Sequence, residues 1–414
     1  MNKSNSNIEY LKKHYNKYSY PPDNFNIEDV FIKNKSRHYN DITFNWHKIW
    51  PEKNFSNQKL NILVAGCGTR EAVLHALCNP HHDFIGVDLS KKSIQSSNEL
   101  KNKFKLKNLE LFCDDFRRIN FKKKFSYIIC TGVIHHLDDP NTALDYFKNI
   151  LEEDGVLSLM VYGDKIRHSL IQVKKVLSKL PINLDSKSID FANNFFNSLN
   201  LNHPARIYAE NTNDIKFDSG IADLILHKSE KFYSIENLIS SLNKSDLTIK
   251  NFEGGNIKSL SKFFLGNQKY ISILRNLEPE MQWSFGQILN WNDSKISLYA
   301  THKKNIKYSI AYNFPDLSKI FICYRTEINY KIINNKLLLK LKNNEEYHLD
   351  VPKVSEEILI KALEGQIQIN EILSKLDNNQ LDDAKEFFTL LIENVFVDIS
   401  FHKISKERLI DISI

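Results

Sequence analysis

Short apolar runs alternate with amphipathic stretches along the chain from residue 61 onward. Five of the runs have the length and composition of buried strands, and three of the stretches between them have the length of helices. The predicted strands are Asn61–Ala65, Asp83–Val87, Leu109–Cys113, Phe125–Cys130 and Gly155–Tyr162, and the predicted helices are Thr69–Cys78, Ser90–Lys103 and Asp139–Leu151. Strands that alternate with helices form a mainly parallel sheet with helices on both faces, so we predict an α/β, doubly wound, Rossmann-like fold.

The third of these helices carries its own boundary signals. Asp139 is a good N-cap acceptor, and Pro140 is tolerated in the first helical turn. We predict that the helix stops at Asp154-Gly155, because glycine readily adopts the left-handed conformation that ends many helices.

The alternation breaks after Tyr162. Three helical segments follow and predict a lid inserted at about residues 164–245, because the segment is too long for a plain connection. They are Ile166–Leu180, Lys187–Leu199 and Ser234–Leu242. Leu247–Glu253 and Lys295–Thr301 are predicted to be two further strands, with a second helical insert between them, and would complete a seven-stranded sheet.

The C-terminal part of the chain predicts a separate small α+β domain. The β-like segments Ser318–Cys323 and Lys336–Leu341 precede three predicted helices that begin at Ser355, and the apolar run Asn394–Val397 predicts a closing strand. The spacing resembles small winged-helix modules that recognise peptides. We therefore predict an N-terminal arm over residues 1–50, the sheet-and-lid domain over 51–304 and an accessory α+β, winged-helix-like domain over 305–414.

Composition and charge narrow the function classes. Of 414 residues, 42% are hydrophobic and 26% are charged, no apolar run reaches membrane-spanning length, and the start of the chain is polar. We predict a cytoplasmic protein without membrane contact. Residues 351–414 hold 7 Lys/Arg and 12 Asp/Glu, which disfavours nucleic acid as their partner because phosphate binding needs cationic side chains. The five cysteines include no CxxC pair and predict neither a disulfide framework nor a zinc site.

The turn after the first predicted strand is rich in glycine. The strand leads into Gly66-Cys67-Gly68, and the second strand ends at Asp88. Glycines at such a turn let the backbone approach a bound cofactor, and an acidic residue after the next strand can accept both hydroxyls of a ribose. The third glycine of the dinucleotide fingerprint is absent because Glu71 takes its place, and no Walker phosphate loop follows the turn.

Five motifs in the same order make residues 61–163 similar to class I S-adenosylmethionine-dependent methyltransferases. They are the glycine turn Val64–Thr69, the ribose acid Asp88, the acidic turn Asp114–Phe116, the segment Thr131–Pro140 and Gly155. The sheet of that family has seven strands, and the last two form an antiparallel edge. The rest of the chain more weakly resembles a group of uncharacterised bacterial methyltransferases, through Tyr20-Pro21-Pro22, His203–Tyr208, Asp223–His227 and Tyr233-Ser234.

The resemblance implies S-adenosylmethionine as the cofactor and gives roles to residues at the motif turns. It implies that the turn of Gly66, Cys67 and Gly68 lies under the methionine part, and that Asp88 and Leu89 hold the ribose and the adenine. Asp115, or Asp114 as its alternative, and Phe116 would hold the adenine. Thr131 and Gly132 would follow the cofactor near the sulfonium.

Arg70 departs from the family, in which glycine is common at this position. Its side chain could pair with the carboxylate of the cofactor or obstruct the pocket. Tyr18, Tyr20 and Pro21 could fold over the cofactor as a cover or pack on the edge of the sheet, and both alternatives stay open at this point.

Two adjacent histidines are the candidate catalytic residues. His136, and after it His135, follow the fourth strand where an acceptor would approach, and imidazole titrates in the useful pH range. Methyl transfer from a sulfonium is an in-line displacement with a good leaving group, so a base is needed only when the acceptor must lose a proton. We predict no metal site, because neighbouring side chains such as His81 and His82 point to opposite faces.

The sequence therefore predicts an S-adenosylmethionine-dependent methyltransferase. A small-molecule acceptor is favoured, and a protein or peptide acceptor comes next. RNA comes last, because the fourth strand lacks the sequences that resemble amino-methylating or cysteine-dependent nucleic-acid enzymes. His227 and Tyr233 could line the acceptor site. The alternative class is a non-catalytic cofactor-binding or scaffold protein, and the accessory domain could dock a substrate or mediate self-association.

Overall fold

The computed structural model describes residues 3–22, 27, 40–165, 167–180, 186–212, 214–253, 260–290, 294–325, 327–341 and 344–404. The chain divides into two compact units. Unit 1 comprises Met1–Asp41, Gln58–Thr248 and Trp291–Asn305, and unit 2 comprises Ile42–Asn57, Ile249–Asn290 and Ile306–Ile414. Compactness alone does not define an independently folding domain, so the predicted boundaries at residues 50 and 304 stay predictions.

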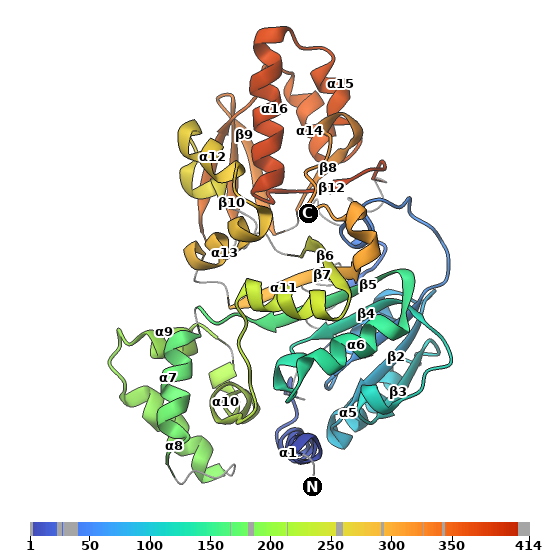
Figure 1. The fold of residues 1–414 in the computed structure, drawn as a ribbon, viewed down its shortest axis with the longest axis vertical. Helices are drawn as coiled ribbons and strands as arrows, with labels where there is room; N and C mark the ends of the chain where they lie inside the picture. Colours follow the sequence, from blue (N-terminus) through green and yellow to red (C-terminus); the bar gives the residue numbers. More distant parts are fainter. Residues whose placement is uncertain are drawn as a thin grey trace. The chain divides into compact units, whose positions relative to one another are not determined.

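A seven-stranded sheet carries the fold of unit 1 (Figure 1), and its last strand in space, β6, crosses the division between the units. The strands are β1 Asn61–Ala65, β2 Asp83–Asp88, β3 Leu109–Cys113, β4 Phe125–Thr131, β5 Leu151–Tyr162, β6 Leu247–Phe252 and β7 Lys295–His302, in the order β3-β2-β1-β4-β5-β7-β6. β1 to β5 run parallel, and β7 pairs antiparallel with β5. The predicted doubly wound sheet is confirmed.

Helices between the strands pack around this sheet. They are α4 Glu71–Cys78, α5 Lys91–Lys103, α6 Pro140–Ile150 and α11 Ile235–Lys244. The predicted cap at Asp139 is present, since its side chain accepts the backbone N–H of Asn141. The predicted helix end at Gly155 is wrong, because α6 ends at Ile150. Gly155 lies inside β5, where an added Cβ would be 3.0 Å from the carbonyl oxygen of Phe125, so close strand packing requires glycine there.

The lid follows β5 in unit 1. Its helical segments are α7 His168–Leu177, α8 Ser186–Ser198, α9 Pro204–Glu210, η4 Asp214–Lys216, α10 Asp218–Ile221 and the π-helical η5 Ala222–Leu226. These segments share an apolar core that includes Leu170, Ala192 and Ile225, and they form the light green group of helices in Figure 1. Arg167, directly before α7, pairs with Glu230 at 2.7 Å. The first helix, α1 Lys3–Lys17, contacts α5.

Unit 2 is an α+β unit with two small antiparallel sheets. β9 Ile328–Ile333, β10 Lys336–Leu341 and β11 Glu346–Asp350 form one sheet, and β8 Phe321–Tyr324 pairs with β12 Val397–Ser400 in the other. The helical segments are α3 Trp46–Ile49, η6 Ser261–Phe264, α12 Gln268–Arg275, α13 Pro279–Leu289, η8 Leu317–Lys319, α14 Glu356–Leu363, α15 Ile369–Leu373 and α16 Asn378–Glu393, while η7 Lys303–Tyr308 follows β7. The predicted small α+β part is confirmed, and its winged-helix character stays a prediction.

The closing strand of unit 2 begins later than the sequence predicted. α16 runs to Glu393, Val395 adopts a left-handed conformation with φ 50°, and β12 begins only at Val397. Phe396 is 1% exposed. The apolar run Asn394–Val397 is therefore the turn between α16 and β12, and only its last residue belongs to the strand.

A buried ion network joins the first segment of unit 2 to its closing strand. Asp398 of β12 accepts a hydrogen bond from Arg325 at 2.7 Å and lies 3.3 Å from Nζ of Lys48. Burial opposes ionisation of this carboxyl, but the two cations hold the pKa of Asp398 well below its usual range. The anion is therefore neutralised within unit 2.

Within the described part of the chain, every helix is too short or too polar to cross a bilayer. The cytoplasmic location stays a prediction.

His75 of α4 gives the stability of unit 1 a testable pH dependence. The ring is buried, with Nδ1 3.3 Å from the carbonyl oxygen of Asn40 and Nε2 3.2 Å from its amide nitrogen. Burial lowers the pKa of His75 to about 4. The unfolded chain binds a proton at this position near pH 6.5, so the stability contributed by the neutral ring is lost as the pH falls from about 6.5 to about 4.

We expect this one group to lower the free energy of unfolding by about 2 kcal/mol between pH 7 and pH 5. Urea unfolding followed by circular dichroism should show a smaller loss over this interval in His75→Gln than in the wild type. The variant of the exposed neighbour, His81→Gln, should behave as the wild type does. Equal losses in all three proteins would contradict the assignment.

Candidate functional site

A cavity of ≈ 360 Å³ lies at the carboxyl ends of β1 to β4 in unit 1. Its lining includes every residue for which the sequence predicted contact with a cofactor. These residues are Gly66, Cys67, Gly68, Asp88, Leu89, Asp114, Asp115, Phe116, Thr131 and Gly132. They come from four strand ends, which parallel pairing brings to one edge of the sheet.

The N-terminal segment passes close to the glycine turn between β1 and α4. Gly66 and Gly68 have φ angles of 72° and 55°, in the region that side chains rarely allow. A Cβ on Gly68 would lie 2.8 Å from the carbonyl oxygen of Tyr20. Glycine at this position therefore lets the backbone around Tyr20 cross the turn in contact with it.

Asp88 closes β2 and holds the turn in place. Its carboxylate accepts the backbone N–H of Gly68 at 2.9 Å and the backbone N–H of Ser90 at 2.8 Å. Burial raises the pKa of Asp88, and the two N–H groups oppose that rise because they stabilise the anion. Each carboxylate oxygen can accept a second hydrogen bond, so Asp88 retains acceptor capacity toward the cavity.

The acidic turn after β3 contains two carboxylates in different surroundings. Asp115 caps η2 (Phe116–Arg118) and accepts hydrogen bonds from Arg117 at 3.0 Å and 2.7 Å. Asp114 is exposed and accepts the backbone N–H of Asp115 at 2.7 Å. Both line the cavity, so both remain possible acceptors for an adenine amino group.

The structure separates the two candidate histidines of η3 (Ile134–His136). His136 lines the cavity, and its Nδ1–H donates to the carbonyl oxygen of Ser229 at 2.9 Å, which leaves Nε2 as the acceptor nitrogen of the neutral ring. His135 is fully buried and is not among the described residues that line the cavity. Its ring packs against Tyr162 with centroids 4.8 Å apart.

The N-terminal segment reaches the cavity through Tyr20 and Pro21. Thr69 donates from Oγ1 to the carbonyl oxygen of Pro21 at 2.9 Å. The Arg70 guanidinium donates to the carbonyl oxygen of Pro22 at 3.3 Å, and Arg70 also lines the cavity. Tyr18 instead packs against the apolar core of the lid.

Further lining residues carry no strong sequence motif. Those used below are Leu11 and Tyr15 of α1, Tyr162 of β5, Asp223 of η5 and Lys295 of β7. Tyr15 donates its hydroxyl hydrogen to Asp223 at 2.9 Å. The weaker resemblance through Asp223–His227 was a sequence signal for this part of the cavity, but it gave Asp223 no role.

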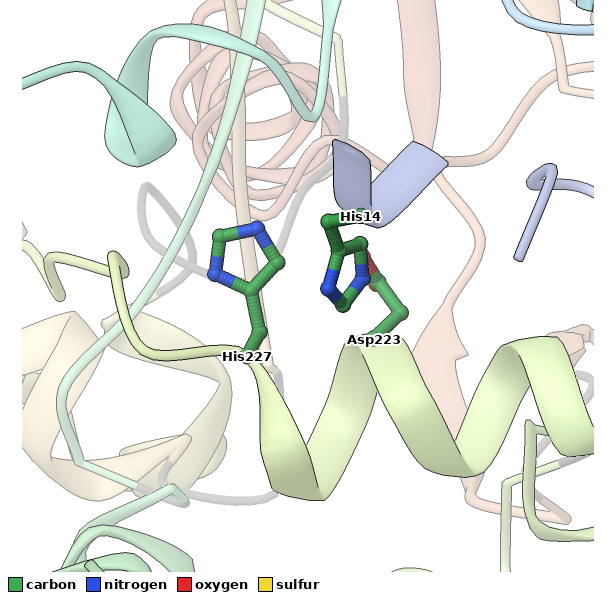
Figure 2. Close-up of side chains that lie close together, drawn as sticks. All are labelled: His14, Asp223 and His227. Carbon is green, nitrogen blue, oxygen red and sulfur yellow. The ribbon is translucent and has the colours of Figure 1, made fainter. Parts of the chain in front are cut away.

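Three side chains beside this cavity lie close enough together to raise the question of a metal. Figure 2 shows Asp223 and His227 rising from one helical segment toward His14 of α1, and one possible ligand atom of each lies within 4.8 Å of the others. Nδ1 of His227 accepts the backbone N–H of Ser229 at 3.1 Å, so the proton of the neutral ring sits on Nε2. The nitrogen that remains for a metal is therefore a donor, and the group does not present three free lone pairs.

A second group of this kind lies in unit 2 and consists of His47, Cys323 and Asp398. Arg325 and Lys48 already neutralise its carboxylate. Burial raises the pKa of the Cys323 thiol, so the thiolate that a metal prefers is disfavoured. We assign this group to the ion network of unit 2.

Residues 56–177 match the family described as a methyltransferase domain. The chain carries a class I S-adenosylmethionine-dependent methyltransferase domain. The family match covers β1 to β5, and the strand order and antiparallel β7 extend beyond the matched residues. The family predicted from the five motifs is confirmed.

Three relatives are similar to the chain in sequence. An uncharacterised protein of Synechococcus is 24% identical over 61% of this chain and 67% of its own length. The tRNA (guanine-N(7)-)-methyltransferase of Rubrobacter xylanophilus is 32% identical over 26% of this chain and 47% of its length, and an uncharacterised protein of Rickettsia prowazekii is 40% identical over 18% and 14%. The chain thus spans less than half of the last two relatives.

Among solved structures, PKMT2 from Rickettsia typhi is similar to the chain. It is 18% identical, the match covers 88% of this chain and 76% of that one, and the TM-score is 0.60. The same protein in complex with AdoHcy gives 17% identity, coverage of 89% and 76%, and a TM-score of 0.59. At this identity the likeness establishes a shared fold, and the AdoHcy belongs to PKMT2.

Gly68 provides a test of how the N-terminal segment is held on the methyltransferase domain. In Gly68→Ala the new methyl group would meet the Tyr20 carbonyl oxygen, and the left-handed backbone would be strained as well. We expect backbone amides of residues 15–20 to exchange with deuterium about 10-fold faster or more, because a loss of about 1.4 kcal/mol in local stability gives that factor.

Gly266→Ala is the matched control for this experiment. Gly266 has φ 84°, and an added Cβ would meet nothing within 4 Å, so the substitution introduces the backbone strain without the contact. Its exchange over residues 15–20 should equal that of the wild type. An unchanged rate in Gly68→Ala would show that the close approach does not hold the segment.

Proposed function

We propose that this protein transfers a methyl group from S-adenosylmethionine, bound in the cavity of unit 1, to a nucleophile that enters beside Tyr15, Tyr20 and His136. The observation that carries the proposal is the convergence of all ten residues with predicted cofactor contacts on one cavity. The cofactor would supply an electrophilic methyl group on a sulfonium. The residues of the chain would bind it, orient it and exclude water.

The space at the glycine turn and the hydrogen-bond acceptors of the cavity fit this cofactor. Asp88 keeps acceptor capacity after its two backbone bonds, as a ribose diol requires. A Cβ on Gly66 would come within 2.3 Å of the Val133 side chain, so the turn leaves room only for a bare backbone beneath the methionine part. Asp115 or Asp114 would accept the adenine amino group, and Thr131 and Gly132 would lie near the sulfonium.

Asp88→Ala is the first test of the cofactor site. The substitution removes up to two charge-assisted hydrogen bonds to the ribose, so we expect the Kd of S-adenosylmethionine and of S-adenosylhomocysteine to rise at least about 30-fold. Calorimetric titration measures both affinities. Asp88→Asn keeps the size of the side chain and one acceptor oxygen, and we expect an intermediate effect.

Asp83→Ala is the control in the same strand. Asp83 begins β2, and its carboxylate pairs with Lys59 at 2.8 Å on the surface, so its removal should leave both affinities unchanged. Equal affinities of Asp88→Ala and the wild type would remove the proposed cofactor site.

We propose His136 as the general base for acceptors that must lose a proton. The hydrogen bond from its Nδ1 to Ser229 fixes the ring, and Nε2 keeps a lone pair. Tyr15 and Tyr20 are poorer bases, because burial raises the pKa of both phenols and each donates its proton to a carboxylate. His135 is the weaker candidate because it is buried away from the described lining of the cavity.

The tautomer of His136 tests this assignment without an acceptor. We expect the neutral ring to carry its proton on Nδ1, whereas free neutral imidazole side chains favour Nε2, because a carbonyl oxygen can only accept. Nitrogen chemical shifts of histidine-labelled protein at neutral pH identify the tautomer, and the signal pair that His136→Gln loses identifies the residue. A proton found on Nε2 would exclude His136 as the base in this conformation.

The acceptor is proposed to be a small molecule, with a protein or peptide as the next choice and nucleic acid disfavoured. The cavity is enclosed by side chains of α1, the glycine turn, β5 and η5, which suits a slender acceptor group. The acidic C-terminal part of unit 2 is proposed to dock a substrate or to mediate self-association. A chain that bound S-adenosylmethionine but methylated nothing would correspond to the non-catalytic alternative.

A further inference from the structure

Asp223 is a carboxyl group at the cavity with no Lys or Arg partner among the described residues. The residue belongs to η5, its side chain lines the cavity, and burial raises its pKa. Among the described residues, the hydroxyl of Tyr15 is its hydrogen-bond partner and no Lys or Arg forms an ion pair with it. Tyr15 orients the carboxylate but adds no positive charge.

Two other carboxylates of the cavity, Asp115 and Asp88, have different partners. Asp115 is paired with Arg117, and Asp88 accepts two backbone N–H groups. Arg70 and Lys295 also line the cavity, and neither of them forms an ion pair with Asp223. A buried carboxylate that lacks a countercharge is stabilised when a cation enters the site beside it.

The imidazoles next to Asp223 do not supply that countercharge. His14 and His227 lie beside it in Figure 2. Burial lowers the pKa of His14 to about 3 and the pKa of His227 well below its usual range. Both rings are therefore neutral at physiological pH. His136 is the neighbouring group whose positive charge would lower the pKa of Asp223, and as the proposed base it is neutral until it takes the proton of the acceptor.

The aromatic walls of the same cavity suit a cation as well. Tyr15 and Tyr20 line it together with Asp223, whereas the third lining tyrosine, Tyr162, already has the guanidinium of Arg167 over its ring at 3.4 Å. The faces of such rings attract ammonium groups, and their hydroxyls stay protonated because burial raises the pKa of each phenol. An acceptor that enters as a phenolate or carboxylate would instead be repelled by Asp223.

We propose that the acceptor is an amine, recognised by Asp223 as an ammonium cation and methylated on nitrogen. This inference rests on the proposed function, since the amine and S-adenosylmethionine would share the cavity. The amine loses one proton to Nε2 of His136, its lone pair forms the new N–C bond, and the C–S bond breaks with its electron pair returning to sulfur. The products are the methylated ammonium, S-adenosylhomocysteine and protonated His136.

The charge displacement during transfer explains why a carboxylate at this position would assist the reaction. Positive charge leaves the sulfonium and develops on the amine nitrogen as the N–C bond forms. A fixed anion beside the nitrogen stabilises that developing charge without reorganisation. Asp223 would therefore act in both recognition of the acceptor and stabilisation of the transition state.

Binding of amine probes to the full chain saturated with S-adenosylhomocysteine tests the proposal. We expect n-hexylamine to bind more tightly than n-hexanol or hexanoate in calorimetric titration. In Asp223→Asn the affinity for n-hexylamine should fall about 10- to 100-fold, the range of one charge-assisted hydrogen bond. The affinity for S-adenosylhomocysteine should be retained, which shows that the variant is folded.

Asp218→Asn is the matched control. Asp218 is an exposed residue of the same lid and should not affect the affinity for any probe. The proposal is overturned if n-hexanol or hexanoate binds as well as n-hexylamine, if no probe binds to the loaded protein, or if Asp223→Asn keeps the wild-type affinity for the amine. Failure of S-adenosylhomocysteine itself to bind would instead overturn the proposed function.

A peptide probe distinguishes an amine on a polypeptide from an amine on a small molecule. Acetyl-Ala-Lys-Ala-amide carries a single amine on a blocked backbone, and its norleucine analogue lacks only the nitrogen. Tighter binding of the lysine peptide than of n-hexylamine would place the amine on a polypeptide, and the reverse order would place it on a small molecule. Equal binding of the lysine and norleucine peptides would overturn recognition of the nitrogen by Asp223.

Discussion

The attachment of Asp88 to the glycine turn is the constraint on which the chemistry of unit 1 depends. One buried carboxylate accepts the backbone N–H groups of Gly68 and Ser90, so the ends of β1 and β2 are joined through an anion that is costly to release. The bare backbone of Gly68 then allows Tyr20 to cross the turn. The position of the Asp88 carboxylate thus fixes both the glycine turn that lines the cavity and the path of the N-terminal segment across that turn.

The charges around the cavity differ in how they are balanced. Asp115 has a guanidinium partner, Asp88 has two backbone donors, and Asp223 has a single phenol. A sulfonium cofactor and a protonated amine would both bring positive charge to these anions, and the reaction moves that charge from sulfur toward nitrogen. The proposed chemistry therefore follows from Asp223, which has a neutral phenol and no Lys or Arg partner among the described residues.

Unit 2 has the opposite arrangement of charge. Asp398 is paired with Arg325 and Lys48, and Arg325 also reaches Glu327, so the buried ions neutralise one another. Such a network resists the loss of any member and favours one packing of the segments that carry it. We therefore assign this network a structural role. The proposed docking role in unit 2 belongs to the acidic C-terminal segment.

The sequence by itself determined the sheet and the cofactor end of the cavity, since β1 to β5 contain short apolar runs and the motif residues lie directly at the strand ends. Local patterns failed at Gly155 and at Asn394–Val397, where tertiary packing decided the conformation. Only the tertiary structure separated His136 from His135 and brought Tyr15 to Asp223, more than two hundred residues away in sequence. The strands follow from local periodicity, whereas the countercharge of a buried group depends on which distant segments fold around it.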